Sequence, residues 1–365
     1  MASFDEVLKD CTKLGTKIPT SEYLENGKYP IIDQGQNDIA GYYNSDDGLF
    51  EDVPAIVFGD HTRVVKYVDK PCFLGADGVK LLCPVDKDIN CKYLFYQLSY
   101  ADIPNTGYNR HFKWVKALDF KISPSDEQNH VVEVLDKVTD LILIHQQQLA
   151  KLDELVKVRF VEMFGDLVVG DKIQTGKKKI GEIASVTKLA GFEFTKYIQY
   201  KEHGDIIMLR GLNCKQGKLI LDDVKWIDRE TSDLLPRSKL YYGDILMTYA
   251  GTIGDVAMVD ENDKYHLAPN VAKVSINNKK AYNPIFLMYL FLYSNDYIMR
   301  FASQVAQASI NMEKIRNFEY YFPDVTFQNQ FADFVERVNQ QKQTVQQSLE
   351  KLELMKKALM QEYFG

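Results

Sequence analysis

The chain contains an internal repeat, and this repeat limits the folds that it can adopt. Residues 146–165 and 346–365 align without a gap at a constant offset. The following positions of the first segment recur in the second: Gln146, Gln147, Leu149, Lys151, Leu152, Lys157, Glu162, Phe164 and Gly165. Self-similarity of this kind indicates two copies of one structural unit, so the architecture is expected to be built twice.

A fainter repeat precedes each of these segments and keeps the same order. Residues 4–7 followed by 12–14 match residues 180–183 followed by 187–189. Each copy then has an apolar run that leads into a polar loop (55–62 and 244–252), and each ends in a strand-like run closed by proline (120–124 and 318–323). The repeat predicts domains at 1–125 and 178–325, long helices at 126–165 and 326–365, and a Gly/Lys-rich linker at 166–177.

The two long helices carry apolar residues at alternating spacings of four and three. In the first helix these are Val131, Leu135, Val138, Ile142, His145, Leu149, Leu152, Val156 and Phe160. In the second they are Phe331, Val335, Val338, Val345, Leu349, Leu352 and Leu359, with Lys342 and Lys356 interrupting the track. This 3.5-residue period is typical of a coiled-coil seam. A helix of about 38 residues spans about 57 Å, which exceeds one such domain, so we expect the helices to pack on each other rather than each on its own domain.

The domains themselves mix strands with short helices. Residues 64–68 and 271–276 are rich in β-branched residues and predict strands, whereas 91–100 and 285–293 predict helices. The fold class is therefore α+β, with two domains joined by two long helices.

Composition excludes several classes of protein. The formal net charge of −7 argues mildly against a DNA-binding surface, unless basic residues gather on one face or a partner contacts the phosphates. Five scattered cysteines without a Cys-x-x-Cys pair indicate reduced thiols rather than a zinc site. The first residues do not resemble a signal peptide, and the longest apolar runs, such as 285–292, fall far short of about 20 residues. We expect a soluble cytoplasmic protein.

Catalytic motifs are absent from the sequence. It has no nucleophile elbow, no His-Glu-x-x-His and no phosphate-binding loop. Asn283-Pro-Ile-Phe286 is similar to the Asn-Pro-Pro-Tyr/Phe tetrapeptide of adenine-N6 methyltransferases, but Ile285 replaces the second proline and no glycine-rich cofactor loop precedes it. The simpler interpretation is that Asn-Pro opens the helix at 285–293.

Polar, basic and glycine-rich loops remain as candidates for a binding surface, and both domains carry them at corresponding places. Their side chains have the donors and acceptors to contact base edges or phosphates, although any single loop of this kind is more often a solvated turn. The candidate DNA-binding residues are His61, Arg63, Tyr108, Asn109, Arg110, His111 and Lys113 in the first domain, and Arg210, Asn213, Lys215, Thr248, Thr252, Gln307 and Asn311 in the second.

These features together resemble the specificity subunits of type I restriction–modification systems. The resemblance rests on the domain–helix–domain–helix order, on the helix endings such as Met163-Phe-Gly-Asp166, and on loops such as Arg110-His-Phe-Lys-Trp114, Arg210-Gly-Leu-Asn213 and Gly251-Thr-Ile-Gly254. It covers nearly the whole chain. It implies that each domain is a target-recognition domain that recognises one half of a split, asymmetric site in double-stranded DNA.

The resemblance also implies a role for the helices and for partner proteins. The helices would form an antiparallel coiled coil that sets the length of the unread spacer and docks two modification subunits, which bind S-adenosylmethionine. An endonuclease subunit is a further expected partner. This chain would contribute no catalytic residue and no cofactor site. The lysines at 342 and 356 depart from the seam pattern and predict a locally loose helix pair.

Two alternatives remain at this stage. The chain could be a DNA adenine methyltransferase or its recognition half, which would bind S-adenosylmethionine itself. It could also be a coiled-coil scaffold without a role on DNA.

Overall fold

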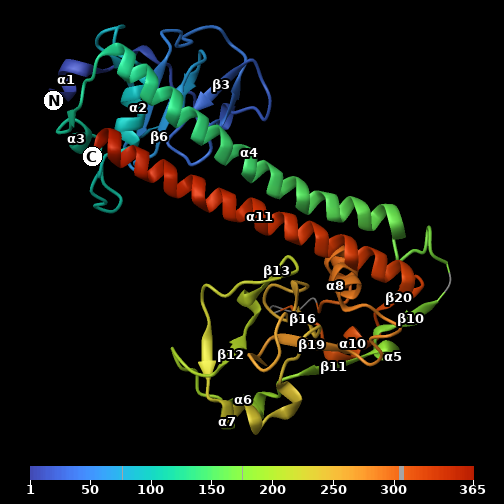
Figure 1. The fold of residues 1–365 in the computed structure, drawn as a ribbon. Helices are drawn as coiled ribbons and strands as arrows, with labels where there is room; N and C mark the ends of the chain where they lie inside the picture. Colours follow the sequence, from blue (N-terminus) through green and yellow to red (C-terminus); the bar gives the residue numbers. More distant parts are fainter. Residues whose placement is uncertain (76, 175, 304–307) are drawn as a thin grey trace. The chain divides into compact units, whose positions relative to one another are not determined.

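The computed structural model describes residues 1–75, 77–174, 176–303 and 308–365 (Figure 1). It forms two compact units, the first made of Met1–Gln147 with Val345–Gly365 and the second of Gln148–Thr344. Each unit therefore contains one domain together with one part of each long helix.

The domain of the first unit is built around two small sheets. A four-stranded sheet has the order β2-β8-β5-β6, and a three-stranded sheet has the order β4-β3-β7, in which β3 and β7 are parallel. The elements are β1 (Ala2–Ser3), α1 (Phe4–Val7), β2 (Leu8–Asp10), η1 (Thr12–Leu14), η2 (Thr20–Glu22), β3 (Tyr29–Ile32), β4 (Gly41–Tyr43), β5 (Ala55–Gly59), β6 (Val65–Val68), β7 (Phe73–Leu74), β8 (Val79–Pro84), α2 (Cys91–Tyr100), α3 (Phe112–Val115) and β9 (Asp119–Phe120).

The domain of the second unit repeats this plan. Its four-stranded sheet has the order β11-β19-β16-β17, its three-stranded sheet the order β15-β12-β18, and β12 and β18 are parallel. The elements are β10 (Lys177–Lys179), α5 (Ile180–Ile183), β11 (Ala184–Lys188), α6 (Gly191–Tyr197), β12 (Ile206–Leu209), η3 (Gly211–Asn213), β13 (Cys214–Lys215), β14 (Lys218–Leu219), β15 (Lys225–Ile227), α7 (Arg229–Asp233), η4 (Pro236–Ser238), β16 (Ile245–Thr248), β17 (Val256–Met258), β18 (Tyr265–Leu267), β19 (Val271–Ile276), α8 (Pro284–Tyr293), α9 (Asn295–Met299), α10 (Met312–Arg316) and β20 (Glu319–Tyr321).

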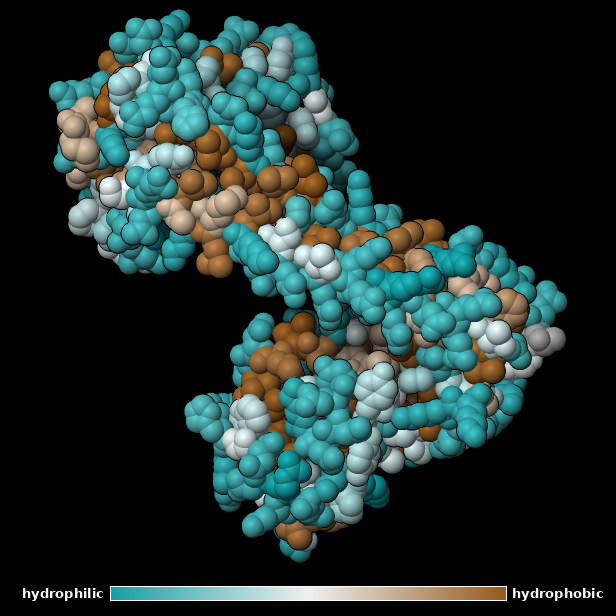
Figure 2. All heavy atoms as spheres, viewed as in Figure 1, coloured by the Kyte–Doolittle hydropathy of each residue, from teal (hydrophilic) through white to brown (hydrophobic). Residues whose placement is uncertain are grey.

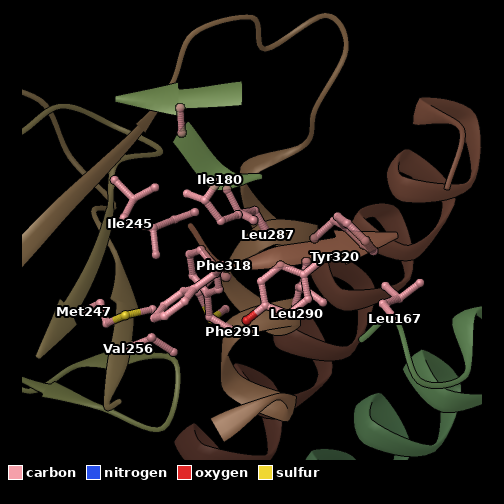
Figure 3. Packing of buried hydrophobic residues seen from close by; sticks show 14 of the residues in the cluster. Leu167, Ile180, Ile245, Met247, Val256, Leu287, Leu290, Phe291, Phe318 and Tyr320 are labelled. Carbon is pink, nitrogen blue, oxygen red and sulfur yellow. The ribbon is translucent and has the colours of Figure 1, made fainter. Parts of the chain in front are cut away.

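Strand register makes the two domains comparable residue by residue. The central pair of the first domain ends with Gly59 opposite Val79, and that of the second ends with Thr248 opposite Val271. Both β5 and β16 are buried along their whole length, which explains why their sequences are continuously apolar. The largest buried cluster lies in the second unit, where α8, β16, β20 and the start of α5 meet (Figure 3). The predicted strand at 271–276 and helix at 91–100 have the bounds expected from the sequence.

The long helices are α4 (Ser125–Phe164) and α11 (Val325–Phe364), and they pack together antiparallel. In the first unit, Val131 and Leu135 near the start of α4 share a cluster with Met360 near the end of α11. In the second unit, Phe160 near the end of α4 packs on Phe331 near the start of α11, with ring centroids 5.3 Å apart. The predicted helix pair is thus confirmed.

The lysines in the seam have partners, contrary to the expected looseness. Lys342 forms an ion pair with Asp153 of α4 within the second unit. Lys356 lies over the ring of Tyr96 at 6.0 Å, and burial lowers the pKa of its ammonium group. A polar residue at a seam position favours one register over its alternatives at some cost in stability.

Some segments differ from expectation. The strand-like run 120–124 contributes only Phe120 to a strand, because β9 is two residues long. In the segment 166–177, predicted as a linker, Leu167 is buried in the core of the second unit (Figure 3). Val168 and Ile173 also pack against this core. The sequence did not reveal these buried apolar residues, because glycine and lysine dominate the segment and indicate a solvent-exposed linker. Within the described residues, no helix is both long enough and apolar enough to cross a membrane.

Candidate nucleic-acid interface

The first candidate loop follows β5 and is held in shape by Gln34. The hydroxyl of Thr62 donates to the Gln34 carbonyl at 2.7 Å, and the amide of His61 donates to Gln34 Oε1 at 3.2 Å. Gln34 Nε2 in turn donates to the Asp77 carbonyl at 3.1 Å. One side chain therefore connects three separate backbone segments. Sequence reasoning missed Gln34, because nothing in its local sequence marks this role.

A second loop, 106–113, lies against the first. The ring of Tyr108 stacks on His61 with centroids 4.8 Å apart and planes 8° from parallel, while His61 Nδ1 lies 3.2 Å from the Asn109 carbonyl. Tyr108 nevertheless remains 89% exposed. The stack joins the two predicted loops into one surface and presents the free face of an aromatic ring to solvent.

Exposed cations extend this surface. Arg110 and Lys113 are both exposed, and Lys113 Nζ lies over the Trp114 ring at 5.1 Å. By contrast, Arg63 adopts a left-handed backbone with φ of 62°, and its guanidinium donates to the Ile103 carbonyl at 3.0 Å. Arg63 thus braces the loop, whereas Arg110 and Lys113 expose their charged groups to solvent.

The prediction that His111 contacts DNA through its side chain is wrong, because this side chain is fully buried. Its Nδ1 lies 3.0 Å from the Asp60 carbonyl and its Nε2 lies 3.3 Å from the Thr106 amide. The Asp60 carboxylate accepts from the Phe112 amide at 2.7 Å. These contacts show that His111 and Asp60 anchor the base of the loop that carries the exposed residues.

The second domain places η3 directly after β12, and Asn213 organises this turn. Asn213 Oδ1 accepts from the Arg210 amide at 3.0 Å, and Nδ2 donates to the carbonyls of Ile220 and Asp223 at 2.7 and 2.8 Å. Asn213 is fully buried, so its predicted contact with DNA is also wrong. The Arg210 guanidinium pairs with the Asp223 carboxylate at 2.9 Å, so a phosphate would have to compete with that carboxylate. Lys215, two residues beyond Asn213, is exposed.

The loop after β16 has the same kind of internal support. Thr248 is fully buried, and its hydroxyl bonds to the Thr252 carbonyl and accepts from the Asp255 amide at 3.0 Å. Its predicted contact with DNA is therefore wrong. Gly251 and Gly254 have φ of 84° and 86°, which glycine adopts without strain, and Thr252 between them is exposed.

A third segment of the second domain joins this loop through backbone hydrogen bonds. The Ile310 amide donates to the Tyr249 carbonyl at 2.9 Å, and Ala250 bridges to Ser309. Asn311 is exposed and caps α10 by accepting from the Lys314 amide at 2.9 Å. Gln307 lies outside the described residues.

All five cysteine residues are buried. Burial raises the pKa of the thiols of Cys72, Cys91 and Cys214 to about 12, so these groups stay protonated and poorly nucleophilic near neutral pH. Within the ranges that the structure describes, no group of three or more His, Cys, Asp or Glu side chains is arranged to hold a metal ion.

The chain thus contains two copies of one α+β domain. Each copy carries polar loops at equivalent strand ends and is followed by a long helix, an arrangement that suits a two-domain recognition protein. The family described as type I restriction modification DNA specificity domain matches residues 5–154 and again 174–354. The chain belongs to this family and contains two copies of its domain.

Individual relatives agree with this assignment. A type I restriction enzyme EcoBI specificity subunit from Escherichia coli is 26% identical over 136 residues, which are 36% of this chain and 28% of that protein. The match thus spans less than a third of that relative's length. The crystal structure of a type I restriction–modification system S subunit from M. genitalium superposes with a TM-score of 0.61 at 16% identity, covering 100% of this chain and 95% of the other. A chain from a study of complex assembly and conformational transition of the type I R-M system gives a TM-score of 0.56 at 13% identity, covering 98% and 94%.

Proposed function

We propose that this chain is the DNA-specificity subunit of a type I restriction–modification complex, and that each domain recognises one half of a bipartite DNA site. The observation that carries the proposal is the duplication of the site. Loops at equivalent strand ends, after Gly59 and after Thr248, expose different side chains on the same framework. Sequence is recognised in DNA through side chains that reach base edges, so two differing loop sets on one fold favour recognition of two different half-sites.

The exposed residues divide into contacts of two kinds. Arg110 has donors that can pair with base edges. Asn109 can offer its side-chain oxygen as an acceptor, because its Nδ2 already donates to the Thr106 carbonyl. Lys113 and Lys215 suit phosphates. Tyr108 offers a ring face on which a base or sugar can pack. The formal net charge of −7 favours a partner that supplies much of the phosphate contact.

In this proposal the chain itself performs no chemistry and binds no cofactor. S-adenosylmethionine would be bound by modification subunits that carry out methylation. The motif that most resembled a methyltransferase has another role here, since Asn283 caps α8 by accepting from the amides of Ile285 and Phe286. The protein would act in the cytoplasm.

The long helices offer a surface for these partner subunits. On α4, Leu141 and Ile144 of the first unit are 42% and 46% exposed, and Leu155 and Val158 of the second unit are 45% and 55% exposed. Figure 2 shows hydrophobic side chains on the visible face of the molecule, including its helices. Exposed apolar residues at helical spacing favour docking of another protein. We propose two modification subunits here, with an endonuclease subunit as a further partner.

Reconstitution tests the proposal and separates it from the methyltransferase alternative. The purified chain should neither bind S-adenosylmethionine nor methylate DNA, whereas the chain mixed with its modification subunit should methylate adenines in one bipartite sequence. The readouts are calorimetry with S-adenosylmethionine and sequencing of modified bases. Cofactor binding or methylation by the chain alone would establish the alternative instead.

A further inference from the structure

A network of three amide side chains occurs twice in the molecule, once at the start of each long helix. In the first unit it consists of Asn90 at the start of α2 with Gln128 and Asn129 in the first turn of α4. In the second it consists of Asn283 at the start of α8 with Gln328 and Asn329 in the first turn of α11. We call each network an amide latch.

The two latches have the same hydrogen bonds. The backbone N–H groups of Asn90 and Asn283 donate to Gln128 Oε1 and Gln328 Oε1 at 2.9 and 3.0 Å. The Asn90 and Asn283 Nδ2 groups donate to the Oδ1 atoms of Asn129 and Asn329 at 2.8 and 2.9 Å.

Each latch also reaches the chain just before its long helix. The Nε2 groups of Gln128 and Gln328 donate to the carbonyls of Ser123 and Pro323 at 2.7 and 2.8 Å. Each glutamine therefore ties the short helix of the domain to the first turn of the long helix and to the residues that lead into it.

Both glutamines are nearly inaccessible to solvent, with exposed fractions of 3% and 1%. Because hydrogen bonds are directional and a buried amide that loses its partner is costly, such a network permits only a narrow range of angles between the two helices that it joins. A purely apolar contact would tolerate sliding more easily, because it has no preferred direction.

The surroundings of the latches differ between the two units. In the first, Asp136 of α4 accepts from the Tyr96 hydroxyl at 2.6 Å and pairs with Lys92 at 2.8 Å. In the second, Phe331 of α11 packs on Tyr289 with ring centroids 5.5 Å apart. The latch is thus retained while the neighbouring contacts change from ionic to aromatic, which points to a requirement on the angle rather than on stability alone.

We propose that the amide latches are positioning devices that fix the angle between each recognition domain and the long helix that follows it, and thereby the spacer length that the protein accepts. This inference rests on the proposed function. A rotation at either latch would displace the recognition loops of that domain along the DNA, so a loosened latch should admit neighbouring spacer lengths without changing either half-site.

The test uses the complex of this chain with its modification subunit and a DNA library. Every library member has both half-sites mapped for the wild type, separated by a single spacer. Across the library the spacer ranges from two base pairs shorter to two base pairs longer than the wild-type spacer. Gln128→Leu and Gln328→Leu remove both hydrogen-bonding groups at similar size. Gln128→Glu and Gln328→Glu keep the acceptor for the asparagine amide and remove the donor, so they report on the latch if the leucine variants do not fold. Ile56→Val and Ile245→Val, in the two cores, serve as controls for lowered stability.

We expect the latch variants to raise methylation at spacers one base pair too long or too short by about tenfold relative to the wild type, since tenfold corresponds to losing one well-formed interaction. The glutamate variants should give a smaller increase in the same direction. The core controls should keep the wild-type spacer profile at a comparable fall in Tm. A folded latch variant that retains the wild-type profile, or controls that broaden it equally, would overturn the inference. A wild-type complex that methylates no bipartite site would contradict the proposed function and this inference with it.

Discussion

The two domains share a framework but stabilise their loops by different means. In both, a carbonyl directly after the central strand accepts from a distant loop, since Asp60 accepts from the His111 amide at 2.8 Å and Tyr249 from the Ile310 amide at 2.9 Å. Buried or clamping side chains support the loop in both domains, through Asp60 in the first and Thr248 in the second. The first domain adds an aromatic stack, whereas the second adds a backbone bridge and two tight glycine turns. The framework fixes where the loops begin, and each domain then builds its own surface.

Burial separates framework residues from recognition residues even within one loop. The buried residues stabilise the loops through hydrogen bonds, and they are His111, Asn213 and Thr248. The exposed residues lie on the same loops or next to them, and they are Arg110, Lys215 and Thr252. Residues of the second kind can change without altering the fold.

Exchange of the whole second domain should change specificity more than any other substitution. Replacing residues 178–325 by the equivalent domain of a relative should change one half-site completely and leave the other unchanged, because each domain is proposed to recognise its own half-site. Sequencing of methylated bases provides the measurement. The exchange of residues 1–125 is the matched control and should change the opposite half. If one exchange altered both half-sites, the domains would not be independent.

A change in helix length should alter the spacer. Each unit contains packed parts of both helices. Seven residues inserted near Leu149 alone would therefore break the helix contacts of one unit, either Phe160 with Phe331 or Val131 with Met360. A second heptad near Ser348, whose hydroxyl lies 3.0 Å from His145 Nε2, would preserve the seam. The paired insertion adds about 10.5 Å and should lengthen the spacer by up to about three base pairs.

Methylation mapping of the paired variant gives the result, and the unread spacer is the quantity to compare. An insertion of two residues in α4 alone is the control and should abolish assembly, because it rotates the seam out of register. An active paired variant with its original spacer would show that the partner subunits, and not the helices, position the domains.

The sequence was informative about periodic features and less so about the site. Helix length, the seam and the repeat were predictable because they depend on spacing along the chain. The burial of His111 was not, because a polar side chain looks the same in a sequence whether it faces solvent or Asp60 across 51 positions. The amide latches were missed as well, since their meaning depends on a contact between residues 90 and 128 rather than on local pattern.

A smaller effect is expected at the exposed cations of the first domain. Arg110→Ala should cost about 1–3 kcal/mol of binding and relax recognition at one base pair if Arg110 contacts a base. Lys113→Ala should weaken binding to all sequences about equally and reduce the salt dependence by about one counterion. Binding of the assembled complex to cognate and mismatched duplexes at several salt concentrations separates these outcomes.

The control for these variants is Lys87→Ala, which removes an exposed lysine beyond the opposite end of β8 from the recognition loops. It should leave affinity and specificity unchanged. Unaltered binding after both Arg110 and Lys113 are replaced would remove this loop from the interface.

A weaker effect concerns the pH dependence that His266 gives to the stability of the second domain. His111 and His266 are both fully buried. His111 Nδ1 lies 3.0 Å from the Asp60 carbonyl, and His266 Nδ1 lies 3.1 Å from the Leu267 carbonyl. Burial lowers the pKa of His266 below its ordinary value of 6.5. As pH falls below about 6.5, His266 becomes protonated in the unfolded chain but stays neutral in the folded domain. The free energy of unfolding of the second domain therefore falls by at most about 1.4 kcal/mol per pH unit, until the pH reaches the lower pKa of His266 in the folded domain.

His266→Asn keeps a donor near Nδ1 and removes the titrating group, so its unfolding transition should depend less on pH between 7 and 5 than that of the wild type. Calorimetric Tm values of the full chain across this range, with His61→Asn at the half-exposed histidine as the matched control, measure the difference. Equal pH dependence in the wild type and His266→Asn would show that this histidine ionises as readily in the folded domain as in the unfolded chain.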